Sequence, residues 1–217
     1  MEEKKKDWLP IIIYIAIFFG LQIIIGILYG YLTATGSNIS EGQILSLTNI
    51  IIYMVIGLTF IILYHKRLIN DCKRFTKRDI VITIISLIVL LAINFGLTAL
   101  MLKLNVEMAN QDMAISLLDH YKRFMVIALV LCGPIAEEIV YRYSLGTLIK
   151  NETTFVIVSS VIFGAIHGLG IITILYALMG AVLALCYLKT DRNIVSSMLI
   201  HIINNAIGII MAISIIG

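Results

Sequence analysis

The chain has 217 residues, of which 60% are hydrophobic and only 13% charged, and its mean hydropathy is +1.04. Soluble domains are about 45–50% apolar and about 25% charged, so this composition excludes a soluble enzyme and a soluble nucleic-acid-binding protein. The formal net charge of +3 is too small to indicate a polyanionic partner. The three cysteines lie far apart and predict neither a disulfide framework nor a thiolate metal site.

Seven apolar stretches follow one another and predict an all-α, polytopic transmembrane helical bundle of about seven spans. About 20 helical residues cross the roughly 30 Å hydrocarbon core, and most of the stretches are long enough. The fifth is short, so we expect it to tilt or to extend into its flanks. In chain order the stretches are Leu9–Leu32, Ile44–Tyr64, Ile80–Leu102, Phe124–Ile149, Thr154–His167, Ile171–Leu188 and Ile194–Ile216.

The basic residues predict the orientation of this bundle. Twelve of the 16 Lys and Arg residues lie in the amino-terminal segment or in alternate loops after it. Because cytoplasmic loops carry an excess of Lys and Arg, we expect the amino terminus in the cytoplasm and the carboxyl terminus outside. On the outer side, the segment 103–123 is predicted to form a short amphipathic helix.

The domain organisation is predicted to be simple. Lys4–Lys6 precede a first stretch that is longer than the roughly 7–15 apolar residues of a secretory signal, so we expect that stretch to stay attached as an anchor. We predict a single membrane domain, 1–217, in which residues 1–123 form the spans without motifs. Residues 124–217 form the core that carries the motifs.

The fourth stretch carries ionisable residues in the middle of an apolar helix. Such a group near the bilayer centre costs about 2.5–3.5 kcal/mol, so it indicates a function or a partner inside the bundle. Glu138 and Arg142 are four residues apart and share one helix face, whereas Glu137 points about 100° away. One carboxylate can thus be neutralised locally while the other stays free. Pro134, just before them, is expected to kink or restart the helix.

Two later stretches carry histidines at membrane depth. His167 ends the fifth stretch, and His201 lies in the last one. Asn205 follows His201 by four residues on the same helix face, and Asn204, three residues after His201, is the alternative amide. If these spans converge, one cavity holds a carboxylate, two imidazoles and an amide, which can activate a water and stabilise an oxyanion. Helix lengths place Glu137 and His201 each about 10 Å, and His167 about 20 Å, above the cytoplasmic boundary. The fifth helix must therefore tilt, start deeper or be displaced.

Simpler interpretations exist for each of these residues. Glu138 and Arg142 could form a buried ion pair with only a structural role, and a single intramembrane histidine is usually a hydrogen-bonded core residue. Asn205 could join two helices. Buried charges also suit the ion path of a small transporter, which predicts internal repeats that the sequence does not show.

Three motifs on successive apolar helices, in this order, resemble those of the CPBP family (CAAX proteases and bacteriocin-processing enzymes, also called the Abi family). These are intramembrane endopeptidases related to the CAAX prenyl protease. The resemblance covers roughly residue 124 to the end of the chain. The motifs are Glu137-Glu138-x-x-x-Arg142, Phe163-x-x-x-His167 and His201-x-x-x-Asn205.

The resemblance implies a role for each motif residue. Glu137 would be the general base that activates the hydrolytic water, with help from His167. His201 and Asn205 would stabilise the oxyanion of the tetrahedral intermediate.

The remaining motif residues and the metal content follow from the same resemblance. Glu138 and Arg142 would form a supporting ion pair. The family is often described as metalloproteases, and Glu137, His167 and His201 could hold Zn²⁺ with an open position. A metal-free glutamate mechanism explains the same residues, and the sequence leaves both open.

The sequence therefore predicts an intramembrane endopeptidase that cleaves a small peptide or a membrane protein. Maturation of a bacteriocin or pheromone, or self-immunity, is the expected setting, in the plasma membrane of a bacterium. The alternative is a non-catalytic immunity or scaffold protein of the same family. The expected partners are a peptide or membrane-protein substrate and the lipid bilayer, with no nucleic acid.

Overall fold

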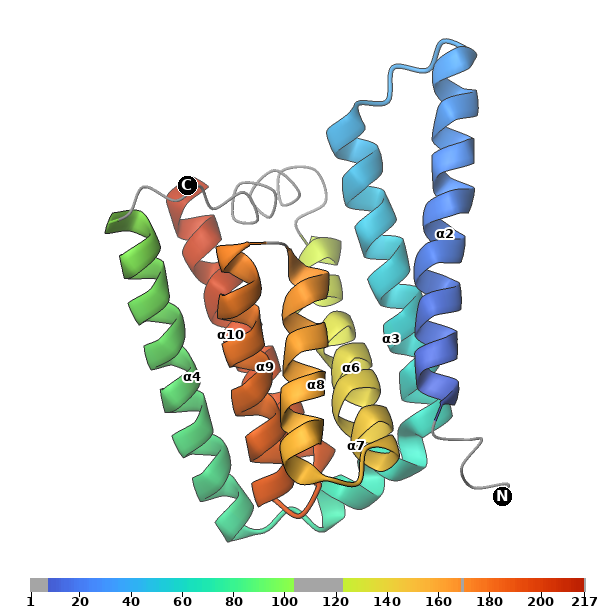
Figure 1. Ribbon diagram of the computed structural model, residues 1–217. Coiled ribbons are helices and arrows are strands. Elements are labelled where there is room, and N and C mark those ends of the chain that lie inside the picture. Colours follow the sequence, from blue (N-terminus) through green and yellow to red (C-terminus); the bar gives the residue numbers. More distant parts are fainter. Residues whose placement is uncertain (1–7, 104–122, 169, 217) are drawn as a thin grey trace.

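The computed structural model describes residues 8–103, 123–168 and 170–216, and none of these residues lies in a β-strand. The helices stand side by side in one bundle (Figure 1). The predicted all-α fold is confirmed. The elements are α2 (Leu9–Ala34), α3 (Glu41–Lys73), α4 (Lys77–Lys103), the π-helical segment η1 (Ala128–Cys132), α6 (Gly133–Glu138), the π-helical segment η2 (Ile139–Ser144), α7 (Leu145–Leu148), α8 (Glu152–His167), α9 (Ile171–Lys189) and α10 (Ile194–Ile216).

Six helices within the described part of the chain are long and apolar enough to cross a bilayer. One of them, Arg123–Leu148, is a continuous span in which helical residues 123–127 are followed by η1, α6, η2 and α7, and we call it the fourth span. Helix α8 has 16 residues and is about 24 Å long. It begins two residues before the predicted start because the side chain of Asn151 accepts the backbone N–H of Thr154 at 2.9 Å and caps it.

The described connections alternate between two ends of the bundle, as expected for successive spans. Connections 74–76, 149–151 and 190–193 lie at the end where α2 begins, and connection 35–40 and the carboxyl-terminal end of α8 lie at the opposite end (Figure 1). Which end faces the cytoplasm stays a prediction. The predicted amphipathic helix of 103–123 falls almost entirely outside the described residues, as do Lys4–Lys6.

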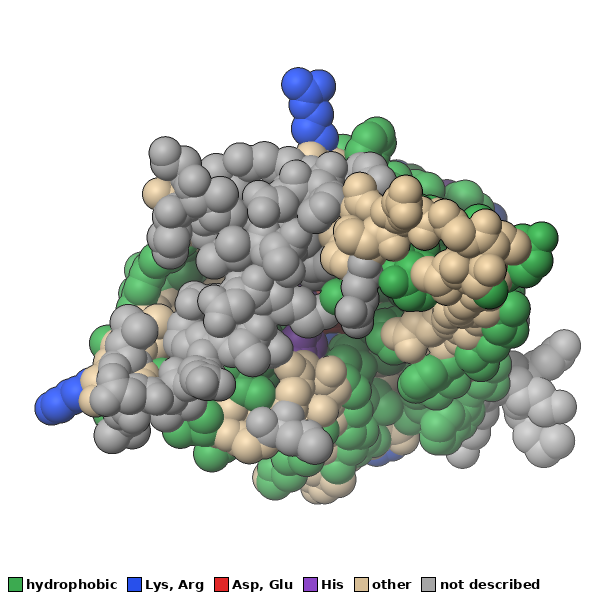
Figure 2. Space-filling model, turned by 90° about the horizontal axis from the view of Figure 1, so that it is seen from above, with side chains coloured by type: hydrophobic (Ala, Val, Ile, Leu, Met, Phe, Trp, Pro, Cys, Tyr) green, Lys and Arg blue, Asp and Glu red, His purple; other side chains and the backbone are tan. Residues whose placement is uncertain are grey.

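The distribution of polarity is inverted relative to that of a soluble protein. Large apolar side chains such as Ile23, Ile27 and Ile62 are 62%, 69% and 68% exposed, and hydrophobic side chains cover much of the visible described surface in Figure 2. Glu138 and Arg142 are instead fully buried. Lipid solvates apolar side chains but not charges, so this is the pattern of a multi-pass membrane protein.

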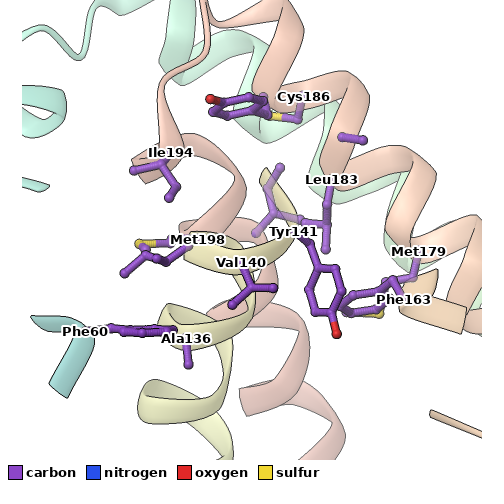
Figure 3. Close-up of a cluster of buried hydrophobic side chains, with 14 of the residues drawn as sticks. Phe60, Ala136, Val140, Tyr141, Phe163, Met179, Leu183, Cys186, Ile194 and Met198 are labelled. Atoms are coloured by element: carbon purple, nitrogen blue, oxygen red, sulfur yellow. The ribbon is translucent and has the colours of Figure 1, made fainter. Parts of the chain in front are cut away.

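A buried hydrophobic core joins the fourth span to its neighbours and holds α8 in place. Helices α8 and α9 approach closely at Gly164, where a Cβ atom would lie 2.4 Å from the carbonyl oxygen of Thr173. The carboxyl-terminal end of α8 is therefore packed tightly against α9. Figure 3 shows core residues from several elements, among them Phe60 from α3, Tyr141 from η2, Phe163 from α8, Leu183 from α9 and Met198 from α10.

The buried carboxylate of Asp71 ties the end of α3 to the start of α10. Its side chain is 2% exposed and accepts hydrogen bonds from Nε of Arg67 at 3.0 Å and of Arg74 at 2.9 Å. Its Oδ2 atom also accepts the backbone N–H of Ile194 at 3.1 Å. The side chain of Asn193 donates to the backbone carbonyl of Asp71 at 2.9 Å. These bonds fix where α10 begins relative to α3.

We expect Asp71→Asn to lower the free energy of unfolding by about 2–3 kcal/mol, because an amide loses the charge and turns an N–H₂ group towards buried donors. Stability in detergent can be followed by dye labelling of the buried thiols of Cys132 and Cys186 during heating, in a Cys72→Ser background. Asp191→Asn is the matched control, since the exposed ion pair of Asp191 should contribute at most about 1 kcal/mol. Equal melting temperatures for the two variants would contradict this prediction.

Candidate active site

The helical geometry of the fourth span is irregular on both sides of the paired glutamates. Pro134 lies in the first turn of α6, which is preceded by η1 and followed by η2. Proline has no backbone N–H, so a carbonyl group of the preceding turn lacks its helical hydrogen bond. A π-helical turn accommodates such an interruption. The structure has one π-helical segment before α6 and one after it. They flank Glu137 and Glu138, which are both buried.

The side chains of two histidines from two other helices lie close to the Glu137 carboxylate. Its Oε2 atom lies 3.8 Å from Nε2 of His167 on α8 and 3.7 Å from Nε2 of His201 on α10. The side chains of Glu137 and His201 are 6% and 2% exposed, and that of His167 is 22% exposed. The structure therefore brings together the free carboxylate and both histidines that the sequence singled out.

Hydrogen bonds on the other ring nitrogens orient both imidazoles. Nδ1 of His167 lies 2.6 Å from the carbonyl oxygen of Phe163, and Nδ1 of His201 lies 3.0 Å from Oε1 of Glu138. A carbonyl or carboxylate oxygen only accepts, so we assign the proton to Nδ1 in each ring. In the neutral rings both Nε2 atoms, which face Glu137, are then acceptors.

Glu138 and Arg142 form a fully buried ion pair. Nε of Arg142 lies 3.3 Å from Oε2 of Glu138, and both side chains are 0% exposed. The guanidinium also lies over the ring of Phe163, 5.3 Å from its centroid. Glu138 thus contacts Arg142 on one side and His201 on the other. The contact with His201 was not predicted. The two residues are 63 positions apart on different helices, and helical spacing relates only residues of one helix.

Aromatic rings hold the two histidines in place. The ring of His167 stacks on Tyr176 of α9 with centroids 4.3 Å apart and an interplanar angle of 15°. Phe163 lies 4.5 Å from the ring of His167 and 5.7 Å, edge to face, from that of His201. Helix α8 ends directly after His167 at Gly168, whose φ of 152° favours glycine. Sequence reasoning missed Tyr176, whose only signal was a polar-tipped aromatic in an apolar helix.

Asn205 lies one helical turn after His201 and faces the fourth span. Its amide donates to the carbonyl oxygen of Leu129 in η1 at 3.0 Å. The neighbouring Asn204 accepts a hydrogen bond from Asn94 of α4 at 2.6 Å and lies 3.5 Å from the amide oxygen of Asn205. Among the described residues, no hydrogen bond joins Asn205 to the glutamates or histidines. Asn94, which was not predicted, thus belongs to the amide chain that positions Asn205.

A cavity of about 500 Å³ opens beside Glu137 and His167. Its wall is mainly apolar and comes from α2, α3, η2, α7 and α8, so the spans without motifs also contribute to the site. The other lining residues are Ile11, Tyr14, Ile15, Phe18, Phe19, Tyr53, Val140, Tyr141, Leu145, Ile162 and Ile166.

The donor atoms of the zinc alternative lie slightly further apart than in a zinc-bound site. Two imidazoles and a carboxylate are suitable donor types, but donor atoms about 2.0–2.2 Å from a tetrahedral Zn²⁺ lie roughly 3.3–3.5 Å from each other. The observed separations from Glu137 to His167 and His201 are 3.8 and 3.7 Å. Within the described part of the chain, no group of three His, Cys, Asp or Glu side chains is arranged to hold a metal ion.

The fold and the site define a polytopic helical membrane protein with a buried glutamate and histidine centre, and comparison with known proteins agrees with the predicted resemblance. Residues 120–207, which include all three motifs, match the family model described as type II CAAX prenyl endopeptidase Rce1-like. This segment therefore resembles the CAAX endopeptidases. No solved structure gives a significant match.

Two bacterial proteins are similar to part of this chain. The "UPF0177 protein YaiH" of Lactococcus lactis subsp. lactis (strain IL1403) is 37% identical over 82 residues, which are 37% of this chain and 34% of that protein. The "Putative membrane peptidase YdiL" of Bacillus subtilis (strain 168) is 34% identical over 90 residues, or 40% of this chain and 36% of that protein. The matched segment spans about a third of the length of these relatives.

Proposed function

We propose that this protein is an intramembrane endopeptidase in which Glu137 activates a water molecule for attack on a peptide bond. The observation that carries the proposal is the position of the Glu137 carboxylate, which faces Nε2 of His167 and of His201 beside a cavity. A carboxylate held between two imidazoles in a mostly water-excluded site is suited to general-base catalysis. The likeness of residues 120–207 to CAAX endopeptidases supports the same reaction class.

The reaction needs one base and one proton donor, and Glu137 can serve as both in turn. It takes a proton from the water as the water oxygen bonds to the substrate carbonyl carbon, which gives a tetrahedral oxyanion. The protonated Glu137 then gives this proton to the leaving nitrogen as the C–N bond breaks. The products are a carboxylic acid and an amine. His167, whose Nε2 acceptor faces Glu137, helps to orient the water.

Two side chains of α10 are proposed to stabilise the oxyanion. Because Nδ1 of His201 donates to Glu138, its Nε2 atom can donate only when the ring carries both protons. In this proposal the oxyanion is therefore stabilised by an imidazolium. The amide of Asn205 has two N–H bonds, of which one is directed at the carbonyl of Leu129, and the second is available as a donor.

The proposed substrate is a small peptide or a segment of a membrane protein, such as a leader-bearing bacteriocin, a peptide pheromone or a lipoprotein fragment. The proposed location is the plasma membrane of a bacterium. The relatives come from Lactococcus lactis and Bacillus subtilis, which supports a bacterial setting. A non-catalytic immunity or scaffold role is the competing outcome of the experiment below.

We expect Glu137→Gln to abolish the proteolytic product, because the amide is isosteric but cannot accept the proton of water. The experiment compares membrane and secreted peptides by quantitative mass spectrometry in cells that carry equal membrane amounts of the wild-type or variant protein. Glu152→Gln is the matched control, since Glu152 is an exposed residue in the first turn of α8.

A peptide present with wild-type protein and with Glu152→Gln, but absent with Glu137→Gln, would support proteolysis and supply the substrate sequence. Identical peptide pools in all three strains, with any cellular phenotype retained, would exclude Glu137 as the base. The protein would then belong to the immunity or scaffold class.

A further inference from the structure

The cavity beside Glu137 has two walls of different origin. One wall comes from the segment that matches the family model and includes Glu137, Tyr141 and His167. The other comes from α2 and α3, outside that segment, and includes Tyr14 and Tyr53. The first spans therefore shape the space next to the proposed reacting groups, although they carry no motif.

The cavity lies between two helices whose apolar residues face outwards. Ile15 and Phe19 of α2 are 50% and 55% exposed, and Ile166 of α8 is 52% exposed, yet all three line the cavity. In a bilayer such exposed residues lie in hydrocarbon. Helix α2 packs on α3 and η2, while α8 packs mainly on α9. The part of the cavity rim formed by α2 and α8 thus faces the hydrocarbon.

The volume of the cavity limits what can occupy it. One turn of an α-helix with its side chains, about 10 Å wide and 5.4 Å long, fills roughly 420 Å³. The cavity of about 500 Å³ holds little more than this. The cavity therefore holds only a short segment, and we consider an extended one. Its backbone N–H and C=O groups have lost their helical partners at a depth where water cannot replace them.

Three tyrosines supply hydrogen-bonding groups in this otherwise apolar space. Tyr14, Tyr53 and Tyr141 come from α2, α3 and η2, and all three line the cavity. Tyr141 is only 4% exposed. Within the described part of the chain, no hydrogen bond joins any of the three hydroxyls to a protein group, so each can bind a ligand in the cavity.

We infer that Tyr14, Tyr53 and Tyr141 form a substrate-binding site for the backbone of an extended, apolar peptide segment that enters between α2 and α8. A phenol hydroxyl both donates and accepts, so it can bind an amide N–H or a carbonyl oxygen. The apolar residues around them accept the side chains of the segment. Only one part of this inference rests on the proposed function, namely that the bound segment presents a peptide bond to Glu137.

Binding can be measured without hydrolysis on the full-length Glu137→Gln protein in lipid nanodiscs. The probe is a fluorescein-labelled nonapeptide of Leu, Ala and Phe, and the readout is fluorescence anisotropy. We expect Tyr14→Phe and Tyr53→Phe, each added to Glu137→Gln, to weaken binding about three- to tenfold. Tyr31→Phe, on the exposed face of the same helix α2, is the matched control and should leave the Kd unchanged.

A backbone N-methylated version of the nonapeptide separates backbone recognition from apolar contact. It should bind more weakly than the parent peptide to the Glu137→Gln protein, and this difference should shrink when Tyr14→Phe is added. Equal Kd values for all tyrosine variants, equal Kd values for the two peptides, or no saturable binding would each overturn the inference. Binding that depends on the tyrosines, without any product in the cellular experiment, would instead retain this site and reject the proteolytic function.

Discussion

Replacing His201 by alanine should lower the rate of peptide hydrolysis by about 10²–10³-fold, with little change in KM. His201 is proposed to donate from Nε2 to the oxyanion, an interaction that forms only in the transition state. Its ring is positioned for this by Glu138 at 3.0 Å and by the edge of Phe163. The measurement is steady-state kinetics on the purified protein in detergent, with the substrate identified by the peptide comparison.

A matched control separates chemistry from a general effect of losing an imidazole. His65→Ala removes an exposed histidine of α3 and should leave kcat unchanged. The melting temperature of His201→Ala should be measured in parallel, because the change also removes a partner of Glu138. An unchanged kcat in a folded His201→Ala protein would remove His201 from the proposed mechanism. A rise in KM alone would assign it to substrate binding.

Replacing Arg142 by methionine should destabilise the protein by about 3–5 kcal/mol, because it leaves the carboxylate of Glu138 buried without its cationic partner. Both side chains are 0% exposed, so protein atoms surround the remaining charge. The measurement is the temperature at which half of the protein is lost from its monodisperse size-exclusion peak in detergent.

Two further variants test the cause of this loss. Arg78→Met is the matched control, since Arg78 pairs with Asp191 at the surface, where the two side chains are 61% and 77% exposed, and it should cost at most about 1 kcal/mol. Adding Glu138→Gln to Arg142→Met removes the unpaired charge and should restore most of the stability. If the double variant is no more stable than Arg142→Met, the loss comes from packing against Phe163 and not from charge.

The depth estimate from helix lengths failed for His167, and the structure shows why. Counting residues placed His167 about 10 Å further from the predicted cytoplasmic boundary than Glu137, yet their side chains lie 3.8 Å apart. The estimate assumed that every span begins at the same plane. Helix α8, which carries His167 and begins at Glu152, is instead positioned by its packing against α9.

The sequence by itself determined the helical class, the number of apolar segments and the ionisable residues that need a function or a partner. The reason is the solvent: hydrocarbon requires long apolar helices and penalises every charge, so Glu137, Glu138 and Arg142 stand out in an apolar run. The division into a motif-free part, 1–123, and a motif-bearing part, 124–217, stays a prediction. The family resemblance of roughly residues 124–217 also came from the motifs alone, and the family model matches residues 120–207.

Only the tertiary structure decided which of these residues touch and which others join them. The contact of His201 with Glu138 fixes the position of the imidazole protons, and Asn94, Tyr14 and Tyr53 come from spans without any motif. Helical periodicity relates residues within one span, but no local rule sets the rotation and depth of one span relative to another. Those are set by packing, such as the close approach at Gly164, and by buried polar bonds, such as those of Asp71.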